Sequence, residues 1–191
     1  MFANNDMEML SDGWDLEVRR LLAIDGVGVV GARLLYPNDR VQHAGIVMGA
    51  LNGEPLHEGL RTSRNERGPL DRWVRRRPAT AVTGAFMAMR RSVFDQVGGF
   101  DAENFAVSCN DVDFCLHAGV AGWTILYAPE FILHHHECVS RGHSNTEAKK
   151  SAPQKKRGGY SRAGEIALVS TRLAILNGNG AASVFSRECE A

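Results

Sequence analysis

The chain has 191 residues, and its 22 lysines and arginines balance 22 aspartates and glutamates, so its formal net charge is zero. Hydrophobic residues make up 44% of the sequence and charged residues 23%, which is typical of a globular protein and excludes disordered, collagen-like and coiled-coil chains. This length suffices for one domain with a substantial core. The balanced charge argues against a protein that binds by bulk attraction to polyanions.

No uncharged stretch approaches the roughly 18–20 apolar residues that a membrane-spanning helix needs. The first six residues lack the basic and apolar segments of a secretory signal, so we expect a cytoplasmic protein. Its four cysteines are then expected to be reduced thiols: Cys109, Cys115, Cys138 and Cys189.

A first helix is predicted after Ser11 or Asp12, either of which can cap it. Its buried face carries residues at helical spacing, namely Trp14, Val18, Leu21 and Leu22. A mostly apolar run over 27–35 predicts a buried strand, and 41–50 predicts another.

Residues 54–79 are dense in charge, glycine and proline, which indicates a long loop with at most a short helix. A strand is predicted over 80–89, followed by a short helix that Ser92 caps and that Gly98 and Gly99 end.

A second helix is predicted to begin within 108–111 and to end at Gly122, before strands at 124–127 and 131–133. Strands that alternate with helices predict an α/β domain. The pattern then dissolves: residues 141–162 hold seven lysines and arginines against one acid, and only 164–176 shows helical periodicity. We therefore divide the chain into a domain over 1–145 and a basic tail over 146–191.

Two acidic clusters are candidates for chemistry. Asn4-Asn5-Asp6 offers the oxygen ligands that a hard divalent cation prefers, although the same residues also favour a cap or turn. Asn110-Asp111-Val112-Asp113 lies at a predicted helix start, where the helix dipole favours acids. Because positions i and i+2 of a helix do not face each other, one aspartate should point to solvent or a site and the other into the fold.

The run His134-His135-His136-Glu137 follows a strand-like segment. If the strand continues, alternation puts His134 and His136 on one side and His135 on the other. Zinc is a weaker alternative, since the cysteine spacing matches no common ligand pattern. Gly84 and Gly99 indicate tight turns or close backbone approaches, and the basic run over 75–77 indicates a solvated surface.

Taken in order, these segments resemble the C-terminal half of a glycosyltransferase family 2 catalytic domain of the rhamnosyltransferase-like bacterial type. The matching segments, in chain order, are residues 4–8, 27–37, 41–45 (Val-Gln-His-Ala-Gly), 82–85 (Val-Thr-Gly-Ala), 97–101 (Val-Gly-Gly-Phe-Asp), 110–113, 135–137 and 140–142. The resemblance implies a GT-A-like mixed sheet flanked by helices, a nucleotide-sugar donor, Mg²⁺ or Mn²⁺, and inversion at the anomeric carbon. It also implies a glycan or lipid-linked acceptor of cell-surface polysaccharide synthesis, with peripheral association at the inner membrane face as an open alternative.

The family's site residues carry over by motif. Asp111 matches the catalytic base, and the metal positions match Asp6 together with His135 or His136. The substrate-binding positions match Asn4, Asn5, His43, Thr83, Gly84, Gly99, Phe100, Asp101 and Asn110. Two positions depart from the family pattern, because Asn4 and Asn110 stand where acids are usual.

The family's nucleotide-binding βαβ half precedes the metal motif, and only three residues precede Asn4 here. We therefore expect a fragment without independent transferase activity. Two alternatives stay open: a non-catalytic remnant that self-associates or binds a missing half through an uncovered sheet edge, and a small metal- or nucleic-acid-binding module. No specific nucleic-acid partner is expected on the leading interpretation.

Overall fold

The computed structural model describes residues 1–50, 54–105 and 109–136. The predicted tail over 146–191, its helix at 164–176, the motif at 140–142, Cys138 and Cys189 lie outside the described residues. Within the described residues, neither Cys109 nor Cys115 forms a disulfide.

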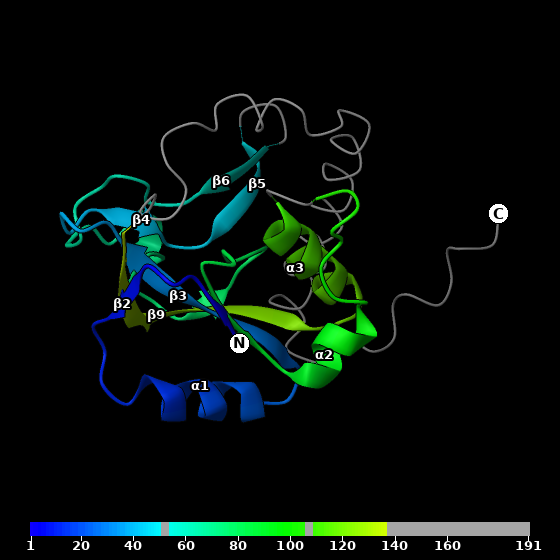
Figure 1. Ribbon diagram of the computed structural model, residues 1–191. Helices are drawn as coiled ribbons and strands as arrows, with labels where there is room; N and C mark the ends of the chain where they lie inside the picture. Colours follow the sequence, from blue (N-terminus) through cyan, green and yellow to red (C-terminus); the bar gives the residue numbers. More distant parts are fainter. Residues whose placement is uncertain (51–53, 106–108, 137–191) are drawn as a thin grey trace.

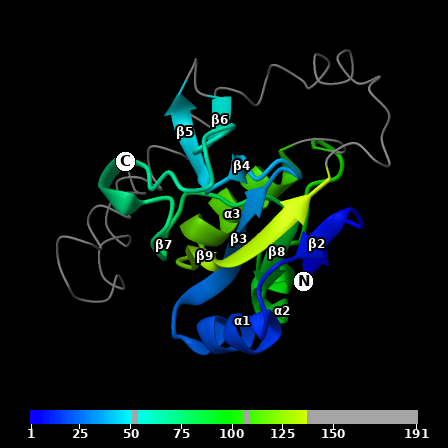
Figure 2. The same cartoon turned by 90° about the vertical axis from the view of Figure 1, so that its left-hand side faces the viewer.

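The core of the fold is a mixed sheet whose strand order is β1-β8-β3-β9-β2 (Figure 1). These strands are β1 (Phe2–Ala3), β8 (Phe86–Met89), β3 (Val27–Leu35), β9 (Thr124–His135) and β2 (Met7–Met9). Two short strands extend it: β4 (Val41–His43) pairs with β3, and β7 (Arg77–Pro78) pairs with β9. β3 and β9 run parallel and the other pairs antiparallel, so the prediction of an α/β protein with a mixed sheet is confirmed (Figure 2).

Helices cover both faces of this sheet (Figure 1). On one face, α1 (Trp14–Ala23) buries Val18 and Leu21 against a core cluster that includes Val30. On the other face lie α2 (Arg91–Gln96) and α3 (Asn110–Val120), and the cluster there includes Phe114. This second face also carries the hairpin of β5 (Ile46–Ala50) and β6 (Glu54–His57), while a short 3₁₀ turn, η1 (Pro69–Asp71), lies in the segment before β7.

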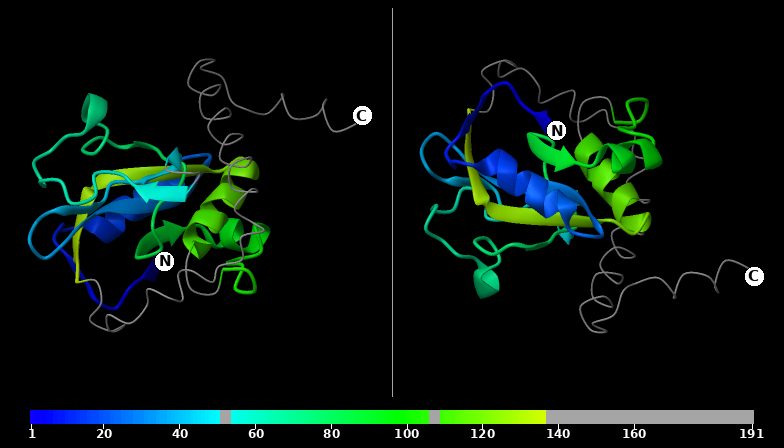
Figure 3. Two further views of the ribbon diagram at one scale, coloured as in Figure 1. Left: turned by 90° about the horizontal axis from the view of Figure 1, so that it is seen from above. Right: turned by 90° about the horizontal axis from the view of Figure 1, so that it is seen from below.

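The first residues of the chain are held to the second face by aromatic contacts. The ring of Phe2 lies 4.8 Å from Phe100 and 5.6 Å from Phe94, centroid to centroid, and Phe100 lies 5.4 Å from Phe114. Figure 3 accordingly shows the amino terminus beside β8 in both views. These contacts fix the position of Asn4, which follows β1.

The two predicted strand segments at 124–127 and 131–133 are one strand. β9 continues through both because its pairing with β3 shifts register, with Ala128 opposite Ala32 but Ile132 opposite Arg33. The residues between include Pro129, which has no N–H to donate to a ladder and therefore belongs at such an irregularity.

Both predicted helix caps are wrong. The Ser11 hydroxyl donates to the carbonyl of Glu130 and accepts from the N–H of Ile132, so it ties the chain to β9 instead of capping α1. Helix α1 starts after Gly13, which takes up a left-handed conformation with φ of 65°. Ser92 lies inside α2, which follows Arg90.

Two predicted strands are shorter than expected. The segment 41–50 is interrupted at Gly45, whose φ of 101° turns the chain between β4 and β5. The segment 80–89 is extended only from Phe86 onward, and the residues before it form a loop that belongs to the candidate site. In the parts of the chain that the structure describes, every helix falls short of the length and apolar character that a membrane crossing needs.

Two glycine-to-alanine changes should act in opposite directions. A Cβ on Gly31 would overlap the Cβ of Val82, so Gly31→Ala overpacks the core and should lower the free energy of unfolding by about 1–3 kcal/mol. A Cβ on Gly119, in α3, would make an ordinary 3.8 Å contact with Ile125, so Gly119→Ala should raise that free energy by about 0.5–1 kcal/mol. Urea unfolding of the two variants measures both signs, and destabilisation by Gly119→Ala would contradict the described packing of α3.

Candidate active site

The loop between β7 and β8 joins two of the predicted site segments. The N–H of Asn4 donates to the carbonyl of Ala85 at 2.9 Å, and the N–H of Gly84 donates to Oδ2 of Asp111 at 2.7 Å. Residues 4 and 111, far apart in the sequence, are therefore attached to adjacent residues of one loop. Thr83 is buried and orders this loop, since its hydroxyl accepts from the N–H of Ala85 at 3.3 Å.

Asp111 lies in the first turn of α3 and is half-buried. Its second oxygen, Oδ1, accepts from the N–H of Val112 at 2.9 Å, and its own N–H donates to Oδ1 of Asn110 at 2.8 Å. Each carboxylate oxygen thus accepts one backbone N–H and keeps a second acceptor site. The close approach to the loop needs Gly84, because a Cβ there would lie 3.2 Å from the Cβ of Asp111.

The two aspartates of this helix diverge, as the spacing predicts. Asp113 is buried, with 8% of its surface exposed, and its Oδ2 lies 3.3 Å from Nδ1 of His117. Asp111 is the carboxylate that faces the loop.

A second cluster forms where β2 pairs with β9. Met7 lies opposite His135, and the N–H of His136 donates to the carbonyl of Asp6. This pairing places Nε2 of His135 3.1 Å from Nδ2 of Asn4 and 3.3 Å from Oδ1 of Asp6. The side chains of Asp6 and His135 are only 11% and 10% exposed.

The histidine run alternates as predicted. His134 and His136 lie beside Glu8, with nitrogen–oxygen distances of 3.7 and 3.6 Å, and His134 also lies 2.9 Å from Oδ1 of Asp39. The imidazole beside Asp6 is therefore that of His135. A metal-binding role for His136 stays a prediction.

Asp6 and His135 fit a divalent cation. Oδ1 of Asp6 is buried and accepts no hydrogen bond, so a lone pair there has no donor. Neighbouring ligands of an octahedral ion at about 2.1 Å lie roughly 3 Å apart, close to the distance between Oδ1 and Nε2. Within 1–50, 54–105 and 109–136, no three His, Cys, Asp or Glu side chains gather as a metal site. A cation that takes one or two protein ligands keeps positions for substrate phosphates, as is common for Mg²⁺.

The remaining predicted substrate residues have other surroundings. Asn5 is exposed; Gly99 adopts a φ of 75° beside the ring of Phe94; the ring of Phe100 belongs to the aromatic cluster; and Asp101 accepts from the N–H of Asn104 in a turn. The substrate-binding roles of these four residues stay predictions.

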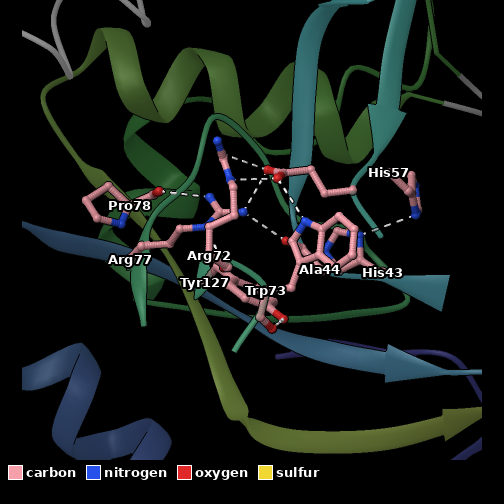
Figure 4. A network of polar contacts seen from close by, with 9 residues as sticks. His43, Ala44, His57, Arg72, Trp73, Arg77, Pro78 and Tyr127 are labelled. Carbon is pink, nitrogen blue, oxygen red and sulfur yellow. Dashed lines mark hydrogen bonds and ion pairs between the residues drawn. The ribbon is translucent and has the colours of Figure 1, made fainter. Parts of the chain in front are cut away.

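His43 lies in the interior, beneath the charged segment between β6 and β7 (residues 58–76) (Figure 4). It is fully buried, its Nδ1 lies 3.3 Å from Nδ1 of His57, and its ring packs edge-on to Tyr127. Its predicted role in substrate binding is untested, and its surroundings are those of a core residue.

A network of polar contacts that includes Arg72, Arg77 and Tyr127 holds the charged segment to the sheet (Figure 4). Oε1 of Glu58 accepts from Arg77 at 2.7 Å and from Arg72 at 2.9 Å, and its Oε2 accepts from the indole of Trp73 at 3.3 Å. The hydroxyl of Tyr127 in turn donates to the carbonyl of Trp73 at 2.8 Å. The side chain of Glu58 is 8% exposed and that of Arg77 15%, so this is a buried ion pair that sequence analysis missed.

Burial of His43 makes stability depend on pH. Burial, and then the positive charges of His57 and Arg77, hold the pKa of His43 well below its ordinary value. The unfolded chain takes up this proton below about pH 6.5 and the native chain does not, so the free energy of unfolding falls with decreasing pH, by at most about 1.4 kcal/mol per unit. Above about pH 6.5 the imidazole is neutral in both the folded and the unfolded chain, so this loss of unfolding free energy is absent there. Urea unfolding between pH 7.5 and 5.5 should show a smaller slope for His43→Gln than for the wild type, and equal slopes would contradict this account.

The site therefore combines a carboxylate that can act as a base with an oxygen–nitrogen pair that fits a cation, on either side of one loop of an α/β sheet. A base and a cation site are elements that enzymes of group transfer use.

Comparisons with known proteins agree with this class. The family described as "Glycosyltransferase like family 2" matches residues 62–161, more than half of the chain. The uncharacterized protein y4gI of Sinorhizobium fredii is 38% identical over 148 residues, which cover 78% of this chain and 16% of that protein. The O-antigen biosynthesis protein RfbC of Myxococcus xanthus is 36% identical over 147 residues, 74% of this chain and 11% of RfbC.

A shorter match is to the N-acetylglucosaminyl-diphospho-decaprenol L-rhamnosyltransferase of Mycobacterium tuberculosis, 41% identical over 66 residues, 35% of this chain and 21% of that enzyme. The chain thus spans between 11% and 21% of the length of these curated relatives. The chain belongs to glycosyltransferase family 2, and the predicted resemblance is confirmed.

Proposed function

We propose that this chain carries the acceptor-activating and cation-binding part of an inverting glycosyltransferase that uses a nucleotide-sugar donor. The acceptor is a hydroxyl group of a glycan or of a lipid-linked sugar, a proposal supported by relatives named for O-antigen biosynthesis and rhamnosyl transfer. The observation that carries the proposal is the pair of backbone hydrogen bonds that attach Asn4 and Asp111 to adjacent residues of one loop.

Asp111 is the proposed general base. An acceptor hydroxyl is a weak nucleophile until a carboxylate removes its proton, and Asp111 keeps acceptor sites free for this. The hydroxyl oxygen forms a bond to the anomeric carbon, the bond from that carbon to the diphosphate oxygen breaks with its electron pair, and the proton goes to Asp111. A single displacement of this kind inverts the anomeric centre.

Asp6 and His135 are the proposed protein ligands of Mg²⁺ or Mn²⁺. A bound divalent cation would neutralise the charge on the departing nucleoside diphosphate. A separate general acid is then unnecessary. The amide nitrogen of Asn4 lies 3.1 Å from Nε2 of His135, so it occupies the ligand position of this imidazole until a cation displaces it.

Calorimetry with UDP and dTDP, each with and without Mn²⁺, tests the proposal on this chain. We expect UDP or dTDP to bind only when Mn²⁺ is present. Asp6→Asn should abolish this binding, and Asp111→Asn should leave it unchanged. Binding that needs neither Mn²⁺ nor Asp6 would contradict the proposed division of roles.

A further inference from the structure

Gln42, which lies in β4, contacts the back of the imidazole that faces Asp6. Its Oε1 lies 2.8 Å from Nδ1 of His135, and both residues are buried, with 6% and 8% of their surfaces exposed. Its neighbour His43 is a predicted substrate-binding residue, whereas Gln42 has no predicted role.

The strand geometry explains why these neighbours point to different places. Successive side chains of a strand alternate between faces, so His43 enters the interior beneath the charged segment while Gln42 points to the opposite face. His135 lies on that face too. It follows Leu133 by two residues in β9, and Leu133 is buried in the core cluster that α1 covers. β4 and β9 both pair with the end of β3, where Leu34 lies opposite His43 on one side and Leu133 on the other. Gln42 thus reaches His135 across the end of β3.

The chemistry of this contact determines the state of the ring. An amide oxygen only accepts hydrogen bonds, so Nδ1 of His135 is the nitrogen that carries the proton. In a neutral imidazole the lone pair then resides on Nε2, which lies 3.3 Å from Oδ1 of Asp6. Nε2 lies 3.1 Å from Nδ2 of Asn4, which donates to it, whereas Oδ1 of Asp6 accepts no hydrogen bond; a cation that replaces the Asn4 donor at Nε2 also satisfies the Asp6 oxygen.

We propose that Gln42 is a positioning residue of the cation site: its amide oxygen holds His135 in the Nδ1-protonated form and so directs the Nε2 lone pair toward Asp6. This inference rests on the cation site of the proposed function. It adds a residue that acts through His135, in the way that outer partners fix ligating histidines in metal sites.

The test compares three substitutions in the full chain. Gln42→Met keeps a similar side-chain length and removes the acceptor, whereas Gln42→Glu keeps an acceptor at the same position. Gln96→Met is the matched control, because Gln96 lies in α2 and accepts from the indole of Trp123, not from His135. Circular dichroism establishes that each variant is folded.

Two measurements are made on each folded variant. Long-range ¹⁵N–¹H NMR at pH 8 reports which ring nitrogen of His135 carries the proton, with no metal present. Electron paramagnetic resonance of free Mn²⁺ during a titration reports affinity for the metal alone. We expect His135 to be protonated on Nδ1 in the wild type, in Gln42→Glu and in Gln96→Met. In Gln42→Met this preference should be lost, and the affinity for Mn²⁺ should be lowered about 10–100-fold.

Two results overturn the inference while leaving the cation site intact: a wild-type His135 protonated on Nε2, or Mn²⁺ binding by Gln42→Met as tight as that of the wild type. A wild-type chain with the expected ring state but no Mn²⁺ binding overturns the cation site itself, and the role of Gln42 falls with it. Since the NMR result is obtained without metal, these two failures are distinguishable.

Discussion

Replacing Asp111 with asparagine should lower the rate of sugar transfer by about 10²–10⁴-fold, the usual contribution of a general base. The amide oxygen of asparagine can still accept from the N–H of Gly84, so the loop should keep its position. Binding of Mn²⁺ and of nucleoside diphosphate should be nearly unchanged, since those ligands are assigned to Asp6 and His135. Steady-state transfer from a UDP- or dTDP-sugar gives the rate, measured with the family's nucleotide-binding half supplied by fusion to this chain, and calorimetry on this chain gives the binding.

Asp113→Asn is the matched control for this prediction. The same helix turn and the same chemical change are involved, but Asp113 is buried beside His117 and does not face the loop. Its effect should therefore fall on the free energy of unfolding more than on the rate constant of transfer. A transfer rate that Asp113→Asn lowers as much as Asp111→Asn does would argue against Asp111 as the base.

Replacing Glu58 with glutamine should lower the free energy of unfolding by about 3–5 kcal/mol, a larger loss than the glycine and histidine substitutions should cause. The reason is that Arg77, which is 15% exposed, would keep its charge in the interior without a carboxylate. Burial already lowers the pKa of Arg77, which the charge of Glu58 counteracts. The substitution also weakens the contacts to Arg72 and Trp73 that hold the charged segment over the sheet.

Urea unfolding measures this loss, and Asp71→Asn provides the control. Asp71 also pairs with two arginines, Arg67 and Arg75, but these side chains are 62% and 70% exposed. Exposed pairs contribute little because water and salt screen them, so Asp71→Asn should have a much smaller effect. Equal losses in the two variants would show that the Glu58 pair is not buried in solution.

Long local patterns were predictable from sequence. The apolar run of β3 is buried at all nine positions, and the start of α3 and the alternation of the three histidines follow directly from residue type and spacing. The prediction that Asn4, Asp6 and Asp111 belong to one site came from the family resemblance, because nothing local relates residue 4 to residue 111.

What sequence could not provide are contacts that depend on tertiary packing. Ser11 has the chemistry of a cap, but the bulge of β9 places backbone groups beside it that compete for its hydroxyl. Gln42 and His43 are adjacent in one motif, and only the pairing of β4 with β3 decides which of them faces the site. Glu58 is one acid in a segment rich in arginine, and its burial follows from the way that segment folds over Tyr127.

The central claim is that a cation binds between Asp6 and His135, adjacent to the loop that holds Asp111. Paramagnetic broadening of backbone amide NMR signals by substoichiometric Mn²⁺ tests it most directly. We predict that the amides of Asn4, Asp6, Gly84 and His135 broaden first, while those of α1 and of the exposed pair Arg91 and Asp95 stay sharp. Broadening centred on Asp95 or Asp71, with the amides around Asp6 unaffected, would contradict the account.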